Sequence, residues 1–278
     1  MHHSIMTVRQ IAQGLCLLAC CIFISACNKD LPNEPKAFSS AQGADRMISP
    51  IPVTPGVMRI PDNNPMTPEK IALGKFLFFD KMLGVPFTQN GKTTGIACAS
   101  CHSPERAFSD NVMVSPGING LTGTRNAPTL VNTGYNIDYT WDGKYHNYEA
   151  QAFGPIINPV EMGNNFNSTP GTYGDYLANP GGNDTAVLFK RLLVNHPGEY
   201  PGLLMKAYGE AAFSVDRIVK ALACFERTIV STGSPFDEYN KFLHYEGGNE
   251  SAISLSAKRG FALFTDSTKT NCVSCHSG

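Results

Sequence analysis

The chain has 278 residues, with 22 basic and 23 acidic side chains and a formal net charge of −1. Because there is no basic excess, the composition excludes a protein that binds nucleic acid through bulk charge, and no acidic tail indicates disorder. Hydrophobic residues make up 42% of the chain, enough for one or two ordinary cores, and the 26 glycines and 19 prolines predict long loops.

Residues 1–27 have the pattern of an export signal. Arg9 precedes the short apolar run "IAQGLCLLACCIFISA", which is too short for a comfortable transmembrane helix. The run ends in "ISAC", which resembles a bacterial lipoprotein cleavage box, so we expect Cys27 to be lipidated; a plain signal peptide is the alternative. The mature protein is therefore predicted to face the periplasm, held to a membrane by a lipid anchor alone.

The remaining chain is predicted to be mainly α. Residues 28–65, rich in Pro, Ser, Asn and Gly, read as a flexible tether. Residues 81–135 are expected to be loop-like, and no segment shows a convincing strand alternation. Helical spacing and capping signals predict helices at 67–80, 145–155 (ended by Gly154-Pro155), 184–209 (two helices broken near Pro197), 214–231, 234–243 and 254–266.

Two copies of C-x-x-C-H carry the chemistry. They are Cys98, Cys101 and His102 in "CASCH", and Cys272, Cys275 and His276 in "CVSCH". In this motif the thiols attach covalently to haem and the histidine ligates the iron, so the sequence predicts two haem c groups. A zinc site, a thioredoxin-like redox pair and a disulfide are the alternatives, but a zinc site would not explain the two following histidines.

The segments before the two motifs are similar to each other. "IALGKFLFFD" precedes the first motif and "SAKRGFALFTD" precedes the second. This similarity predicts two c-type cytochrome-like haem domains, at 66–232 and 233–278, with the second truncated.

The loop after the first motif contains few groups that could serve as the second axial ligand of the haem iron. It has no histidine between Ser103 and Arg125, and Met113 is its one plausible soft ligand. We expect Met113 to pack on the haem edge or in the core instead, which leaves an open iron position for a small ligand such as peroxide. Elsewhere Cys224 is expected to be buried, and His146, His196 and His244 are not expected to ligate iron.

From about Leu73 to its end, the sequence resembles the bacterial dihaem cytochrome c peroxidase family, which includes the methylamine dehydrogenase maturation enzymes. The matching motifs are "LGKFLFFD", "CASCHSPERAFSD", "GTRNAPTLVN", "WDGK", "EAQ", "NPVEMG", "FERTIVS", "SPFDEY" and "CVSCHSG". The resemblance implies that His102 is the proximal ligand of a peroxidatic haem and that His276 is the proximal ligand of an electron-transfer haem.

The resemblance also implies roles for four other residues. Gln151 and Glu161 match the family's distal-pocket glutamine and catalytic glutamate, and Trp141 matches the tryptophan between the haems. Asn126 matches a ligand of an interdomain calcium. On sequence alone, Glu161 reads as a solvated loop carboxylate, Trp141 as a core residue and Asn126 as a turn former.

The implied activity is reduction of hydrogen peroxide to water with electrons from a small donor protein, a cytochrome c or cupredoxin. Two alternatives are an oxidase of a protein or organic substrate and a non-enzymatic electron-transfer cytochrome. The oligomeric state, a homodimer included, is left open.

Two departures from the family pattern matter. The stretch "SPGINGLTGT" lacks the histidine that closes the peroxidatic iron in many of these enzymes, so we expect an iron that is five-coordinate or water-bound at rest. The family's second ligand for the electron-transfer haem comes from far beyond the second motif, so we expect the present sequence to be a partial one.

Overall fold

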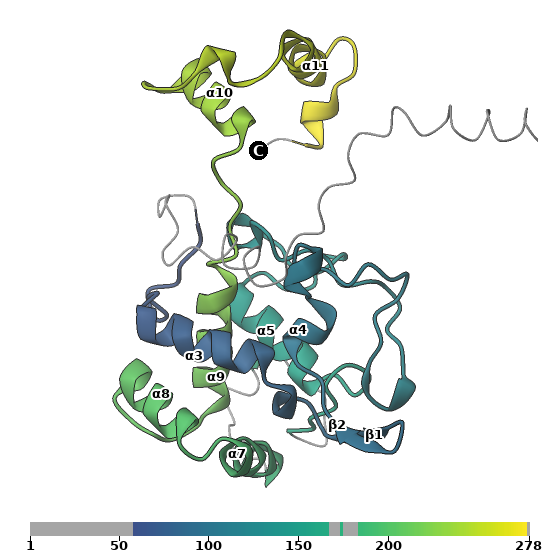
Figure 1. Cartoon of the computed structure of the whole chain (residues 1–278), viewed down its shortest axis with the longest axis vertical. Coiled ribbons are helices and arrows are strands. Elements are labelled where there is room, and N and C mark those ends of the chain that lie inside the picture. Colours follow the sequence, from purple (N-terminus) through teal and green to yellow (C-terminus); the bar gives the residue numbers. More distant parts are fainter. Residues whose placement is uncertain (1–57, 167–172, 175–182, 277–278) are drawn as a thin grey trace, which may run out of the picture. The chain divides into compact units, whose positions relative to one another are not determined.

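The computed structural model describes residues 58–166, 173–174 and 183–276 (Figure 1). The predicted export signal, Cys27 and most of the predicted tether lie outside these residues. The described helices are α3 (Pro68–Phe79), α4 (Cys98–Cys101), α5 (Tyr148–Ile157), α7 (Asn183–Asn195), α8 (Glu199–Tyr208), α9 (Val215–Glu226), α10 (Pro235–His244) and α11 (Leu255–Thr265). Short 3-10 turns span Lys81–Leu83, Pro104–Arg106, Ile118–Gly120, Thr133–Tyr135, Glu250–Ala252 and Cys272–Ser274.

The described part of the chain is mainly helical, as predicted, but it also contains a small hairpin. Strands β1 (Phe87–Gln89) and β2 (Lys92–Thr94) pair antiparallel. Asn90 and Gly91 join them with φ of +52° and +72°, the left-handed pair that a tight two-residue hairpin turn requires. The prediction of loop throughout 81–135 was therefore wrong here, and the Asn-Gly dipeptide was the signal that marked the hairpin.

Helix starts agree better with the sequence than helix ends do. Thr67 caps α3 by accepting a hydrogen bond from the Lys70 amide at 3.2 Å, as its position predicted. The predicted stop of α5 at Gly154-Pro155 was wrong. Pro155 lies inside the helix and removes one backbone donor, but the Asn158 amide still donates to the Gly154 carbonyl at 3.1 Å, so the helical turn continues past the proline.

Helix α9 ends at Glu226, five residues before the predicted end. Beyond it the amides of Thr228 and Ile229 donate to the carbonyls three residues back, Phe225 and Glu226, at 2.8 and 3.1 Å. These tighter turns end the α-helical pattern.

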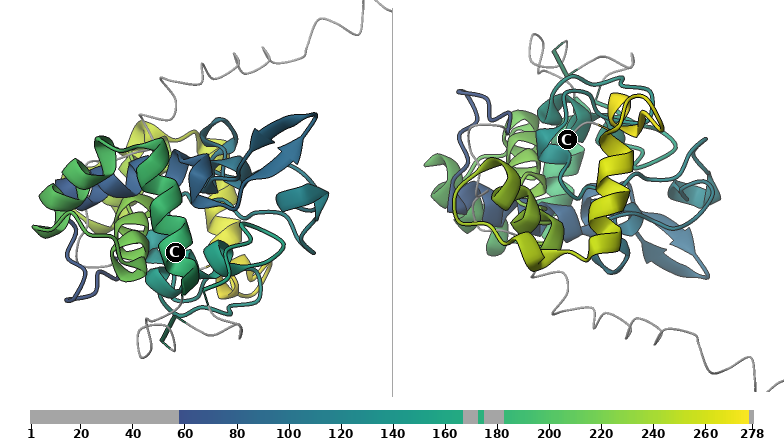
Figure 2. Two further views of the ribbon diagram at one scale, coloured as in Figure 1. Left: turned by 90° about the horizontal axis from the view of Figure 1, so that it is seen from below. Right: turned by 90° about the horizontal axis from the view of Figure 1, so that it is seen from above.

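The core is built on close packing between α3 and α9, which lie side by side (Figures 1 and 2). Gly74 permits this approach, because a Cβ there would lie 1.9 Å from the Ala221 carbonyl oxygen. Helices α8 and α5 pack against α3 and α9 respectively. Cys224 is fully buried in this core, as predicted.

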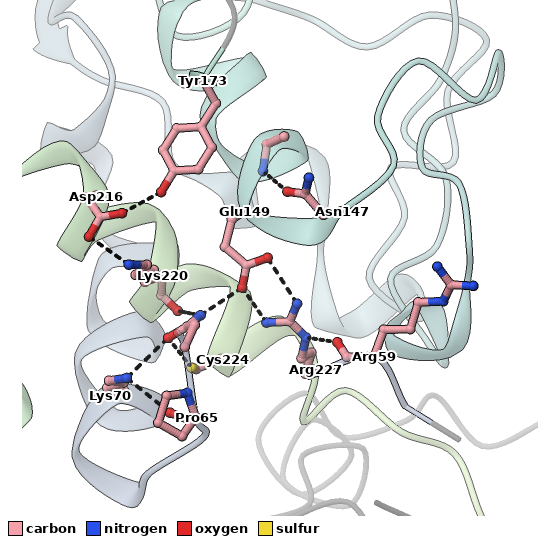
Figure 3. Close-up of polar contacts among 12 residues, drawn as sticks. Arg59, Pro65, Lys70, Asn147, Glu149, Tyr173, Asp216, Lys220, Cys224 and Arg227 are labelled. Carbon is pink, nitrogen blue, oxygen red and sulfur yellow. Dashed lines mark hydrogen bonds and ion pairs between the residues drawn. The ribbon is translucent and has the colours of Figure 1, made fainter. Parts of the chain in front are cut away.

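A buried ion pair ties three segments of the core together (Figure 3). Arg227, just after α9, donates from Nη1 and Nη2 to the two carboxylate oxygens of Glu149 on α5, at 2.8 and 3.1 Å. Asn64 donates from Nδ2 to Glu149 Oε1 at 2.8 Å and accepts from Lys70 Nζ at 3.2 Å. Residues 58–65, assigned to the tether from the sequence, thus contact the core through the fully buried Asn64.

The hydrogen bonds decide the charge of Glu149. Burial alone would raise the pKa of its carboxyl group, but the hydrogen bonds and charge of Arg227, with Asn64, hold the pKa below the ordinary value. The side chain is therefore an anion paired with a guanidinium in a dry environment, where removal of one partner leaves the other charge uncompensated.

The last described segment, 234–276, has its own aromatic contacts. Ser234 caps α10, accepting from the Asp237 amide at 3.1 Å while Asp237 accepts from the Ser234 amide at 2.7 Å. Phe261 of α11 meets Phe236 of α10 edge-on at 5.1 Å between ring centroids. Across the three described ranges, none of the helices combines the length and apolar character needed to cross a membrane.

We predict that Glu149→Ala lowers the free energy of unfolding of the haem-loaded protein by about 3–5 kcal/mol, because it leaves Arg227 buried and unpaired. Chemical denaturation measures the change. Glu210→Ala is the matched control: Glu210 also pairs with an arginine, Arg217 at 2.7 Å, but its side chain is 65% exposed, so a loss under about 1 kcal/mol is expected. Equal losses in the two variants would contradict the assignment.

Candidate haem and peroxide site

The first C-x-x-C-H motif forms a single closed turn. Helix α4 holds Cys98 and Cys101 three positions apart, on neighbouring positions of one face, and both thiols are free. The His102 amide donates to the Cys98 carbonyl at 2.8 Å, which brings the imidazole under the same turn. The donor set of two thiols and one imidazole on one turn fits a covalently attached haem.

A backbone carbonyl orients the His102 ring. Nδ1 of His102 lies 3.0 Å from the Phe108 carbonyl oxygen. A carbonyl can only accept, so Nδ1 carries the proton and Nε2 is left as the iron ligand. Burial lowers the pKa of His102, which favours the neutral imidazole that binds metal.

The loop after the motif takes a strained path to place that carbonyl. Ala107 and Phe108 are consecutive non-glycine residues in the left-handed region, with φ of +53° and +55°. The Phe108 ring is fully buried, and the Leu130 amide donates to the same Phe108 carbonyl at 3.3 Å. Core packing and a second hydrogen bond therefore hold the strained conformation.

Asp110 fixes the rest of this loop. Its carboxylate accepts from the amides of Ala127 and Val112, at 3.0 and 3.3 Å, and from the Ser115 hydroxyl. Burial would raise its pKa, but these hydrogen bonds hold the pKa below the ordinary value. Met113, within the same loop, is 89% exposed. The expectation that it packs in the protein core was therefore wrong.

Glu161 lies in a turn after α5 that two other segments hold in place. The amide of Ile118 donates to the Val160 carbonyl at 3.0 Å, and that of Val85 donates to the Met162 carbonyl at 2.7 Å. Gly117 allows the close approach, since a Cβ there would lie 1.8 Å from the Val160 oxygen. Glu161 itself accepts from Asn158 Nδ2 at 3.0 Å.

Burial and one nearby cation have opposite effects on the pKa of Glu161. Its side chain is half-buried, and burial raises its pKa above the ordinary value, against the opposing charge of Lys144. Its charge in turn acts on Cys98 and Cys101, helping to raise the pKa of both thiols after the larger effect of burial. The structure thus brings Glu161, a solvated carboxylate on sequence alone, beside the first haem-attachment turn.

The other predicted site residues lie on neighbouring segments. Trp141 is 59% exposed and donates from Nε1 to the Asn126 carbonyl at 2.8 Å, so these two residues are in direct contact. Gln151 is half-buried on α5, and within the described ranges no hydrogen bond joins its side chain to Glu161 or Trp141. The loop carrying Trp141 packs on α5 at Gly154, where a Cβ would lie 2.2 Å from the Tyr145 hydroxyl.

The second motif closes its backbone in the same way as the first. The His276 amide donates to the Cys272 carbonyl at 2.9 Å, as that of His102 donates to Cys98. The His276 and Cys275 side chains are exposed, and the His276 ring lies 6.3 Å from the Phe264 ring of α11.

The remaining histidines have other surroundings. His146 is exposed, and its Nδ1 lies 2.6 Å from Asp138 Oδ1. His196 has its Nε2 3.5 Å from Asp80 Oδ1 and packs edge-on against Phe76. His244 is exposed at the end of α10.

Sequence reasoning missed the residues that support the site. Asp110 and Phe108 lie within "CASCHSPERAFSD", but nothing in their spacing shows that a carbonyl would meet His102 or that a carboxylate would organise a loop. The sequence showed Asn158 only as the first residue of "NPVEMG" and did not indicate its hydrogen bond to Glu161. Glu226 had a real signal: it continues the apolar stripe of Val215, Ile218, Val219 and Leu222 on α9, where a carboxylate is unexpected.

Comparison with known protein families identifies the family of this chain. The model of the di-haem cytochrome c peroxidase family matches residues 68–243. The chain belongs to this family. The sequence had already indicated it through "CASCH", "WDGK" and "NPVEMG", and the family's two haems agree with the two C-x-x-C-H motifs.

Individual members of the di-haem peroxidase family are similar over most of this chain. Methylamine utilization protein MauG of Methylophilus methylotrophus is 38% identical over 80% of this chain and 56% of its own length. Cytochrome c551 peroxidase of Nitrosomonas europaea is 31% identical over 82% of this chain and 56% of its own length. The chain spans about half the length of these curated relatives.

A solved structure shows the same fold. The crystal structure of a MauG-like protein associated with microbial copper homeostasis aligns with a TM-score of 0.58 and 28% identity, over 78% of this chain and 54% of that one. The mainly helical fold of the described residues is therefore shared with this MauG-like protein.

We predict that replacing Cys98 and Cys101 together with serine removes one of two covalent haems, because thioether bonds need both thiols. The haem-to-protein ratio, measured in the purified protein after denaturation, should fall by half. Cys224→Ser is the control, since Cys224 is buried in the α9 core and should leave the ratio unchanged. An unchanged ratio in the double variant would contradict the haem assignment.

Proposed function

We propose that the protein is a dihaem peroxidase that reduces hydrogen peroxide to water with electrons from a small redox protein. The observation that carries this proposal is the half-buried Glu161 carboxyl group beside the Cys98–His102 turn. Relatives named cytochrome c peroxidase, at 30–32% identity, support it.

Glu161 would move the proton that peroxide cleavage requires. When bound, the haem on Cys98 and Cys101 would supply an iron that binds peroxide and delivers electrons to it. The Glu161 carboxylate would accept a proton from one oxygen of the peroxide. It would return that proton to the other oxygen, which leaves as water. Two electrons and two further protons complete the reduction to two waters. Gln151 is proposed to position the peroxide.

The other haem would serve as the entry point for electrons. We propose that a cytochrome c or cupredoxin reduces the haem on Cys272 and Cys275, held by His276, and that Trp141 lies on the route between the haems. Asn126 is proposed as a calcium ligand near that route, which its contact with Trp141 supports. Export through residues 1–27 and a lipid on Cys27 would place the enzyme at the periplasmic face of a membrane.

We predict that Glu161→Gln lowers peroxide turnover by about 100-fold or more, the usual contribution of a positioned acid–base group. Both haem spectra should be unchanged, because Glu161 does not attach or ligate a haem. Glu105→Gln is the control, since Glu105 is exposed and lies three residues after His102. Steady-state turnover with a reduced donor measures the effect, and full activity in Glu161→Gln would remove Glu161 from the mechanism.

The pH profile gives an independent check. The raised pKa of Glu161 means that its carboxylate form is lost at a higher pH than the ordinary glutamate value of 4.5. Turnover should therefore fall on acidification with an apparent pKa above that value. A profile flat down to pH 4.5 would show that ionisation of Glu161 is not needed.

We further predict that the iron ligated by His102 is five-coordinate or water-bound in the fully oxidised protein. No histidine lies between Ser103 and Arg125, and Met113 is exposed. Electron paramagnetic resonance of the oxidised holoprotein should show a high-spin ferric signal. A purely low-spin spectrum would contradict an open site and favour the electron-transfer cytochrome.

The substrate oxidase and the peroxidase, as alternative functions, differ in the source of their electrons. A peroxidase consumes a reduced donor protein in proportion to peroxide. An oxidase of a protein or organic substrate consumes peroxide without that donor once its substrate is present.

A further inference from the structure

Glu226 is a buried carboxylate near the first haem-attachment turn. Glu226, the last residue of α9, is 5% exposed, and its Oε2 has no hydrogen-bond partner among the described residues. Nearly all buried polar atoms in folded proteins are hydrogen-bonded, and an unpaired one points to a redox or catalytic role or to a bound water. Its retention on an otherwise apolar stripe therefore requires an explanation.

The cation nearest in sequence does not neutralise Glu226. Both Arg227 Nη groups bind Glu149, and Arg227 Nε donates to the Arg59 carbonyl at 3.1 Å (Figure 3). The Arg227 charge still acts on Glu226, and Glu149 opposes it. Lys70, on the packed helix α3, is bound to Asn64 and the Pro65 carbonyl.

The remaining ionisable groups near Glu226 come from three segments. Cys98 of α4, Tyr148 of α5 and Tyr139 of the preceding loop all have their pKa raised by the Glu226 charge, in addition to the larger effect of burial. At Cys98 this charge acts more strongly than that of any other side chain, Glu161 included. The Glu226 carboxylate therefore lies within electrostatic range of the Cys98 position, where a haem would be attached.

We propose that Glu226 is a redox-linked proton site, which binds one proton from solvent when one electron enters at the haem on Cys98 and Cys101, and releases it on oxidation. The carboxylate and the proton form a neutral carboxyl group, so the added negative charge is balanced locally. The proposal rests on haem attachment at this turn and not on peroxide turnover.

The direction of the coupling follows from the charges. Burial raises the pKa of Glu226 from 4.5 to about 8, so the group titrates near neutral pH. Reduction makes the haem site less positive, which favours the protonated form of a nearby carboxyl group. Proton uptake therefore accompanies reduction, and the midpoint potential should fall as the pH rises through the neutral range.

The test is a spectroelectrochemical titration of the haem on Cys98 and Cys101 in the full, haem-loaded chain, across the neutral pH range. The midpoint potential of the unmodified protein should decrease with rising pH, and Glu226→Gln should abolish most of this dependence. Glu105→Gln, which removes an exposed carboxylate near His102, should leave the dependence intact. Glu161→Gln separates the contribution of the half-buried carboxyl group at the site.

Two results would overturn the proposal. One is a pH dependence in Glu226→Gln equal to that of the unmodified protein. The other comes from difference infrared spectroscopy of the unmodified protein, which does not depend on the folding of a variant. Reduction should add a protonated carboxyl band in the neutral range, and its absence would show that Glu226 keeps one protonation state. A water that satisfies Oε2 without redox linkage gives this second result.

Discussion

The buried pair of Glu149 and Arg227 is the interaction on which the described core most depends. It joins the end of α9 to the start of α5 and, through Asn64, to the segment before α3. Two charges in a dry environment tolerate only a narrow geometry, because each must be matched by the other. The relative position of α5 and α9 is thereby fixed. Glu161 follows α5 by a short turn, and Glu226 ends α9.

Three glutamates of this fold have different electrostatic environments. Glu149 is paired, so its pKa lies below the ordinary value despite burial. Glu161 has one amide partner and an opposing lysine, and its pKa is raised. Glu226 has an unpartnered oxygen, and its pKa is raised furthest of the three, to about 8. Burial alone does not separate Glu149 from Glu226, which are both 5% exposed. The partner of each carboxylate does, because Arg227 binds Glu149 and leaves one oxygen of Glu226 without a partner among the described residues.

The haem-attachment turn depends both on a local motif and on contacts from residues outside that motif. The spacing of Cys98, Cys101 and His102 is local, but the ring of His102 is oriented by the Phe108 carbonyl, which two consecutive left-handed residues place there. That path is stable because Phe108 is buried in the core and Asp110 collects amides from Val112 and Ala127. The ring of the predicted axial ligand is therefore held by contacts that extend well beyond the pentapeptide.

The sequence by itself determined the features that residues close together in the chain encode. These are the two haem-attachment motifs, the helix starts at Thr67 and Ser214, the burial of Cys224 and the family. These depend on neighbours within one or two turns of chain. We overlooked the local Asn90–Gly91 signal for the hairpin, and we misplaced the ends of α5 and α9 because helix ends depend on hydrogen bonds in the terminal turns. Only the tertiary structure decided which carboxylates are paired, which are buried without a partner, and that Glu161 lies beside Cys98 and Cys101. The pKa of a carboxyl group depends on burial, which a local apolar stripe can indicate, and also on charges from distant segments, which no local pattern encodes.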